Sequence, residues 1–203
     1  RRRMVQPGFH PSGLDAVAAH TVAAATEQAE RLRAIGRDWR VSIVALDWGD
    51  APDPGYDTLR SSNGAYHIIV SGSPTLGDSV DGEPDGQPTA AADGDDSDGT
   101  DDEDGVVLPA SLAAGFEATL EVTASAAGLL NAWIDFNADG DWDDAGEQVF
   151  TDEPLAAGVN PLGITVPAAA VLGDTFARFR VDTAGGLAPT GLAMDGEVED
   201  SLV

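Results

Sequence analysis

The sequence predicts a mainly β fold, an antiparallel β-sandwich with long acidic loops, preceded by one N-terminal α-helix. From residue 106 onward, short apolar–polar runs are separated by turn-forming residues at regular intervals, which is typical of a sandwich. Glycine (24 residues) and proline (12 residues) are frequent, as a fold with many turns requires. Only one stretch, near the N-terminus, is identified by its three- and four-residue apolar spacing as a helix.

The first part of the chain is predicted to form an extended arm over residues 1–12, followed by a helix and a connecting strand over residues 13–44. Apolar residues recur at helical spacing from Leu14 to Ile35, and Gly36 is expected to end the helix. A strand is expected over Trp39–Leu46. The narrow apolar stripe of the helix needs a partner, and there are two ways to supply it. The helix packs on its own sandwich, or the chain polymerises into filaments through residues 1–46.

Residues 45–203 are predicted to form the sandwich. Between its strands, residues 71–105 are rich in Gly, Asp and Pro, and eight of the twelve residues in Asp93–Asp104 are acidic. The strands are expected over residues 65–70, 118–125, 129–136, 147–151, 164–167 and 176–182.

The charge balance excludes several classes of partner. The chain has 36 acidic and 10 basic residues, all of them Arg, and a formal net charge of −26. Because no basic patch is available, neither nucleic acid nor an anionic lipid surface is an expected partner. The acidity indicates either a surface adapted to high salt or sites for divalent cations. The absence of cysteine excludes disulfides, Cys-zinc sites and thiol catalysis. No apolar run is long enough for a membrane span, and no signal peptide is visible in this chain.

The sharpest local pattern places oxygen-bearing side chains at alternate positions after a predicted strand. Calcium takes six to eight oxygen ligands, and a loop folded around it presents every second side chain inward. Gly140 is expected to supply the positive φ that turns the chain. A polar hairpin turn is the alternative interpretation. The predicted Ca²⁺ ligands are Asp135, Asn137, Asp139, Asp141, Asp143 and Glu147.

Three further acidic clusters are weaker candidates for metal ligands. The first lies within the acidic run, where a solvated loop is the alternative. The second surrounds a Pro-containing bend, where a structural turn is the alternative. The third flanks Val198, where a charge-protected edge strand is the alternative. The candidate ligands in these clusters are Asp96, Asp98, Asp101 and Asp102 in the first, Asp47 and Asp50 in the second, and Glu197 and Glu199 in the third.

Catalysis is not expected. No nucleophile elbow, phosphate loop or dinucleotide fingerprint is present. Carboxylates are numerous enough for glycoside hydrolysis, but no apolar surrounding marks one of them as a general acid. His67, inside a predicted strand, is interpreted as a hydrogen-bonded structural residue.

Several of these stretches together resemble the GEVED domain of bacterial and archaeal extracellular proteins, over about residues 45–203. The resemblance implies a β-sandwich module of surface or secreted proteins without a catalytic role. The family's closing motif usually continues with Tyr, where this chain has Ser201, and the N-terminal helix is not a feature of the module. The matching stretches are Asp47–Asp53, Gly64–Ile68, Asp85–Pro88, Gly94–Asp96, Asp101–Gly105, Asn131–Glu147, Ala177–Arg180, Pro189–Ala193 and Gly196–Asp200.

The expected function is a non-enzymatic, calcium-binding structural module of an extracellular or cell-surface prokaryotic protein. The predicted fold then has long acidic calcium-binding loops, and the chain acts in a filament or in cell adhesion, with self-association through the arm and helix. A surface glycan or a protein is the expected kind of ligand. The alternative is a carbohydrate-binding or carbohydrate-active domain, in which Trp142 stacks on a sugar.

Overall fold

A computed structural model of the chain describes residues 45–94 and 103–203. The predicted arm and helix, and the candidate ligands Asp96, Asp98, Asp101 and Asp102, lie outside these residues. The described chain is mainly β with almost no helix, only the short 3-10 helix η1 (Arg60–Ser62) lying among the strands. The strands are β1 (Leu46–Trp48), β2 (Ala65–Ile68), β3 (Val106–Val107), β4 (Glu117–Ala124), β5 (Gly128–Ile134), β6 (Gln148–Leu155), β7 (Gly158–Thr165), β8 (Phe176–Asp182), β9 (Gly191–Ala193) and β10 (Glu197–Leu202).

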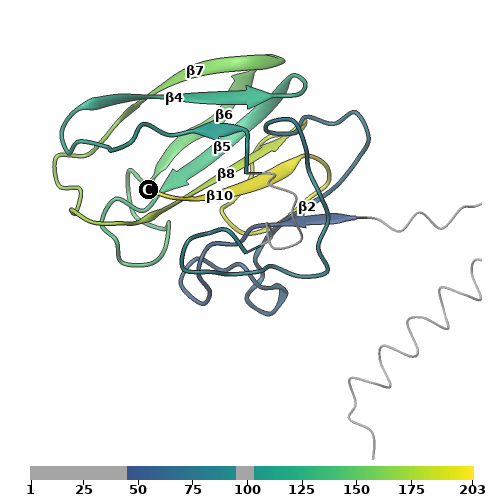
Figure 1. Cartoon of the computed structure of the whole chain (residues 1–203), viewed down its shortest axis with the longest axis horizontal. Helices are drawn as coiled ribbons and strands as arrows, with labels where there is room; N and C mark the ends of the chain where they lie inside the picture. Colours follow the sequence, from purple (N-terminus) through teal and green to yellow (C-terminus); the bar gives the residue numbers. More distant parts are fainter. Residues whose placement is uncertain (1–44, 95–102) are drawn as a thin grey trace, which may run out of the picture. The chain divides into compact units, whose positions relative to one another are not determined.

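The strands form three sheets (Figure 1). The largest has the order β10-β8-β5-β6, the second has the order β3-β4-β7, and the third has the order β1-β2-β9. Neighbouring strands are antiparallel, as predicted, except that β2 and β9 run parallel. Among the described residues there is no helical segment that could span a lipid bilayer.

The four-stranded sheet has one apolar face and one polar face. In β8, Phe179 and Val181 point to one side, so Arg178 and Arg180 point to the other. Phe179 and Val181 belong to one hydrophobic core that also contains buried residues of β4, β5, β6 and β7. The apolar face of this sheet and the inner face of the β3-β4-β7 sheet therefore share a single core.

The polar face of the same sheet is covered by the β1-β2-β9 sheet. Arg180 Nη2 donates to the carbonyl oxygens of Tyr66 in β2 (3.3 Å) and Gly191 in β9 (2.8 Å). The backbone of the small sheet thus supplies acceptors for a charged side chain that the large sheet buries. Both faces of β8 are consequently inside the protein, although its sequence alternates between apolar and charged residues.

Strand β7 begins six residues earlier than the sequence predicts. The expected strand covers residues 164–167, whereas β7 pairs with β4 along its whole length, from Gly158 opposite Ala124 to Thr165 opposite Glu117. Gly158 and Pro161 resemble turn residues in the sequence. Because β7 lies at the edge of its sheet, Pro161 can occupy a position where no N–H is required.

Candidate metal centre

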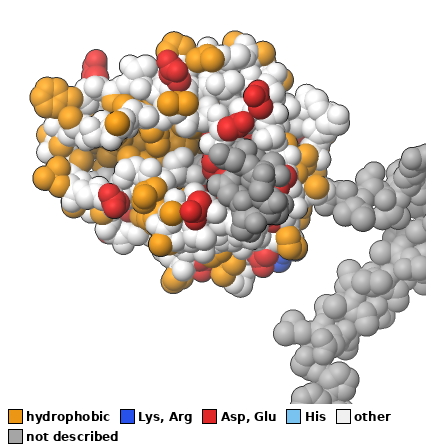
Figure 2. Space-filling model, in the orientation of Figure 1, with side chains coloured by type: hydrophobic (Ala, Val, Ile, Leu, Met, Phe, Trp, Pro, Cys, Tyr) orange, Lys and Arg blue, Asp and Glu red, His pale blue; other side chains and the backbone are white. Residues whose placement is uncertain are grey.

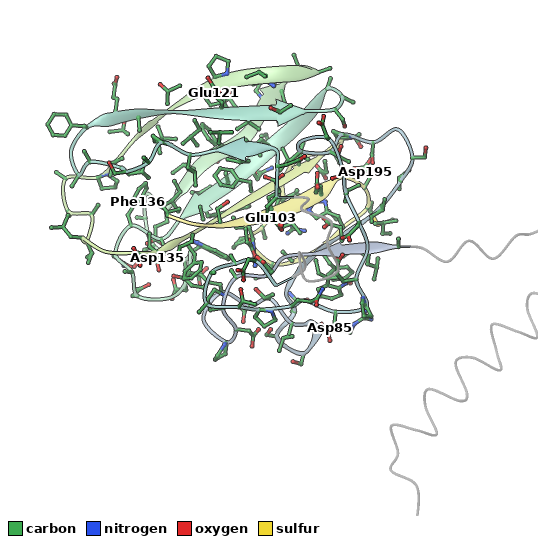
Figure 3. The ribbon with its side chains drawn as sticks, in the orientation of Figure 1. Asp85, Glu103, Glu121, Asp135, Phe136 and Asp195 are labelled. Atoms are coloured by element: carbon green, nitrogen blue, oxygen red, sulfur yellow. The ribbon has the colours of Figure 1, made fainter. Side chains whose placement is uncertain are left out.

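The loop between β5 and β6 contains the predicted calcium ligands, and Asp135 orders its first turn. Asp135 is fully buried at the end of β5, next to Phe136 (Figure 3). Its Oδ1 accepts a hydrogen bond from the Ala138 N–H (2.6 Å). Its Oδ2 accepts from the Gly140 N–H (3.0 Å) and the Tyr56 hydroxyl (2.7 Å). Gly140 adopts the expected positive φ, +96°. Both oxygens of Asp135 are therefore used inside the protein.

Three side chains are joined on the exposed part of this loop. Asn137 Nδ2 donates to Asp139 Oδ2 (3.0 Å) and to Asp144 Oδ2 (2.6 Å). The Asp139 N–H in turn donates to Asn137 Oδ1 (3.0 Å). Two carboxylates are thus held around one amide. Asp144 is not among the predicted ligands, and the loop closes so that Asp144, rather than Asp143, contacts Asn137.

Glu147 is the buried acid at the end of the loop, with 3% of its surface exposed. Its Oε2 accepts a hydrogen bond from the Asp144 N–H (3.3 Å), whereas Oε1 is buried without a hydrogen-bond partner. Burial raises the pKa of Glu147 to about 7, and the negative charges of Asp135, Asp139 and Asp144 add to the rise. A buried carboxylate with an unused oxygen is costly as an anion unless a cation neutralises it.

A hollow of about 310 Å³ adjoins the loop. Its lining includes Asn137, Asp144 and Glu147, together with the apolar side chains of Phe136 and Pro167. The hollow therefore gives an ion access to the side chains that the loop gathers.

Asp141 and Asp143 occupy another side of the loop. The Asp143 N–H donates to Asp141 Oδ1 (2.9 Å), and both residues line a smaller hollow beside Tyr56 and Asp57. The structure thus brings four of the six predicted ligands, Asp135, Asn137, Asp139 and Glu147, into one neighbourhood and places the other two apart.

Trp142, between these two acids, is buried rather than presented to a ligand. Its ring lies against Tyr56, with 4.6 Å between ring centroids, and the Arg178 guanidinium lies over it at 4.4 Å. Protein atoms therefore cover the ring that a sugar would have to stack on.

The residues present fit a cation in part. In the described ranges, no three His, Asp or Glu side chains converge closely enough to hold a metal ion as they stand. Glu147 Oε1 has no hydrogen bond that an ion would have to replace. Asp139 and Asp144 each accept a hydrogen bond from Asn137, and these two bonds would have to break for the carboxylates to bind the ion. Backbone carbonyls and water would supply the remaining oxygens that calcium requires.

The other candidate ligands of the described chain, in the second and third acidic clusters, are buried and bind backbone N–H groups. Glu197 and Glu199 hold Leu76 and Gly105 to β10, Asp47 holds β1 to β10, and Asp50 binds the segment at Gly94. The contacts are Val198 N–H to Asp47 Oδ2 (2.7 Å), Gly94 N–H to Asp50 Oδ2 (2.7 Å), Gly105 N–H to Glu199 Oε1 (2.8 Å) and Leu76 N–H to Glu197 Oε2.

Asp200 and Arg178 form a fully buried ion pair on the polar face of the large sheet. Arg178 Nε and Nη2 donate to the two carboxylate oxygens of Asp200, each at 2.7 Å. Asp200 Oδ2 also accepts from the N–H groups of Asp50 and Ala51, both at 2.9 Å. Arg178 Nη1 donates to backbone carbonyls, including those of Tyr56 and Pro189. This pair therefore connects four segments of the chain.

Arg180 and His67 form a second buried contact on the same face. Arg180 Nε donates to His67 Nε2 (3.0 Å), so the proton of the neutral ring is on Nδ1, which donates to the Asp195 carbonyl (2.8 Å). Burial and the positive charge of Arg180 hold the pKa of His67 well below 6.5. His67 is therefore a hydrogen-bonded internal residue, as predicted.

Neither arginine is recognisable as a buried residue from the sequence alone. Their alternation with Phe179 and Val181 is the pattern of a strand with one face in solvent. The sequence feature that could have identified them is the acidic stretch around Asp200, because it supplies carboxylates on the strand that pairs with β8.

Comparison with known proteins identifies one family. Residues 129–203, which run from β5 to the end of the chain, match the family model described as the GEVED domain. This match confirms the family resemblance for that part of the chain. No curated protein and no solved structure matches the chain.

Proposed function

We propose that this chain, whose residues 129–203 carry the GEVED domain, is a non-enzymatic structural module that binds calcium in the loop between β5 and β6. The module is a β-sandwich of a secreted or cell-surface prokaryotic protein, and it self-associates in a filament or an adhesive assembly. The shared core of the two larger sheets supports the sandwich architecture. Within the described ranges, the internal hydrogen bonds of His67 support a role without proton transfer to a ligand.

The observation that carries the calcium proposal is the state of Glu147. It is buried, one of its oxygens has no hydrogen-bond partner, and three other acids raise its pKa. A divalent cation relieves the repulsion among these acids and the desolvation of Glu147 together. The residues expected to hold the ion are Asn137, Asp139, Asp144 and Glu147.

The test is a thermal melt of the 203-residue chain in excess calcium and in chelator, for the wild type and three variants. Binding to the folded state alone stabilises it by about 2.7 kcal/mol at a hundredfold excess over Kd, which corresponds to a shift of several degrees. We expect Glu147→Gln to abolish this shift and Asp144→Asn to reduce it. Asp143→Asn, which changes a neighbouring acid outside the cluster, is the matched control and should keep the shift.

The wild type and the control decide the outcome. An equal melting midpoint in calcium and in chelator for the wild type, in low salt, would refute calcium binding and leave the acids as a solvated surface. A shift that is lost in Asp143→Asn but kept in Glu147→Gln would place the ion elsewhere in the loop.

A further inference from the structure

An apolar groove opens at the end of the large sheet where the chain terminates. It has a volume of about 350 Å³, and the side chains that line it include Leu112, Ile134, Phe136, Val171 and Val203. Ile134 and Phe136 belong to the hydrophobic core, so the groove leads directly into the core. The space-filling view shows apolar side chains gathered over one half of this face, with acidic side chains around them (Figure 2).

The rim of the groove is also apolar. Val171 is 55% exposed and its neighbour Leu172 is 92% exposed. An apolar groove with exposed aliphatic side chains at its edge is typical of a surface that binds a partner. Asp174 is the acidic side chain in its lining, so the groove offers an anion beside apolar surface.

The distribution of charge along the chain indicates which partner fits. Residues 1–44 contain seven of the ten Arg and four acidic residues, which leaves three Arg and thirty-two acidic residues in residues 45–203. Two of those three, Arg178 and Arg180, are buried, so Arg60 is the exposed cation of the described chain. The described surface therefore attracts cationic segments, and the first 44 residues are both basic and rich in apolar side chains such as Phe9, Trp39 and Ile43.

We infer that this groove binds the N-terminal segment, residues 1–44, of a second copy of the chain. This inference rests on the self-association in the proposed function and names its surface. Apolar side chains of the segment fill the groove, and its arginines face Asp174 and the surrounding acidic surface. The described chain begins at β1, beside β2, whereas Val203 lies toward the other end of this body (Figure 1). A contact between this segment and the groove joins two different surfaces, and such heterologous contacts propagate into open filaments when the rotation does not close.

The absence of cysteine makes a direct test possible, because a single introduced cysteine is the only thiol. Val171→Cys places a photo-cross-linker at the groove. Val159→Cys is the matched control, since Val159 is the same residue type, is 63% exposed and lies on β7 outside the groove lining. Equal amounts of isotopically heavy and light 203-residue chain are mixed, and the cross-linked peptides are identified by mass spectrometry.

We expect the cross-linker at position 171 to capture peptides from residues 1–44, in heavy–light pairs. The inference is overturned by capture of residues 45–203 instead, by capture within the same copy only, by equal capture from position 159, or by no cross-link between copies. As a second measurement, Val171→Asp should weaken self-association in sedimentation velocity by about tenfold or more, because it buries a charge in apolar surroundings. Val159→Asp should leave self-association unchanged.

Melting each cysteine variant in calcium and in chelator separates this inference from the calcium proposal. A retained calcium shift without the cross-link to residues 1–44 overturns the docking alone. The cross-link without a calcium shift leaves the docking in place and refutes calcium binding.

Discussion

Replacing Asp200 by Asn should destabilise the protein strongly, although it changes few atoms. The variant leaves the Arg178 guanidinium as a buried charge without its anionic partner. It also turns an amide NH₂ toward donors, since one carboxylate oxygen faces Arg178 Nε and the other faces the N–H groups of Asp50 and Ala51. At least one donor then loses its acceptor, whichever way the amide is oriented.

The magnitude follows from these two losses. Breaking a buried ion pair by removing one partner costs about 3–5 kcal/mol. Arg178 keeps its contacts to backbone carbonyls and to the Thr58 hydroxyl, which places the expected loss toward the lower end, at about 3 kcal/mol. A domain of this size is stable by about 5–15 kcal/mol, so the loss removes a large fraction of its stability.

Urea unfolding, followed by tryptophan fluorescence at fixed calcium concentration, measures this loss. Arg178 lies over the Trp142 ring, so the emission of the folded variant also reports whether the guanidinium has moved. Asp174→Asn, at an exposed position, is the control and should change stability by less than about 0.5 kcal/mol. A loss below about 1 kcal/mol for Asp200→Asn would refute the role of the ion pair in holding these segments together.

Three other expectations follow from the same structure. The folded state keeps the pKa of His67 well below 6.5, whereas the unfolded chain takes up a proton near pH 6.5. The free energy of unfolding should therefore decrease as the pH is lowered below 6.5, by up to about 1.4 kcal/mol per pH unit. Urea titrations of His67→Gln should lack this pH dependence. The pKa of Glu147 is raised to about 7 in the folded state, so its ionisation lowers the stability of the fold as pH rises from 4.5 through 7. In chelator, the free energy of unfolding of Glu147→Gln should therefore exceed that of the wild type by about 3 kcal/mol at pH 8 and by little at pH 4. Equal free energies of unfolding at pH 8 would contradict this. Gly196→Ala should lower the free energy of unfolding, measured by calorimetry, by at least about 3 kcal/mol, because its Cβ would lie 1.8 Å from the Val181 carbonyl oxygen. Gly158→Ala is the control: Gly158 has a similar φ of +97° and open space around it, so the loss should be about 1 kcal/mol.

The strands were predictable where their residues alternate. The runs at 118–125, 129–136 and 176–182 correspond to β4, β5 and β8, because a side chain in a strand points to the face opposite to that of its neighbours. The start of β7 was not predictable, because Gly158 and Pro161 indicate a turn unless the neighbouring strand is known. Pairing with β4 is a contact between distant residues, which local patterns do not contain.

The candidate metal site was also predictable only in part. The alternating oxygens, the bend at Gly140 and Glu147 at the end of the loop are local features, so the sequence alone located the loop. It did not distinguish Asp143 from Asp144, because the direction of each side chain depends on how the loop closes against the ends of β5 and β6. Nor did it identify Tyr56 as a partner of Asp135, since these residues are far apart in the chain.

By itself the sequence determined the β class, the acidic surface and the position of the calcium-loop pattern, because each depends on composition or on spacing between near neighbours. The tertiary structure alone decided which charged residues are internal. Arg178, Arg180 and Asp200 are buried because other segments cover them. A charge tolerates burial only where distant groups supply its hydrogen bonds and its counter-charge, and those groups come together only when the chain has folded.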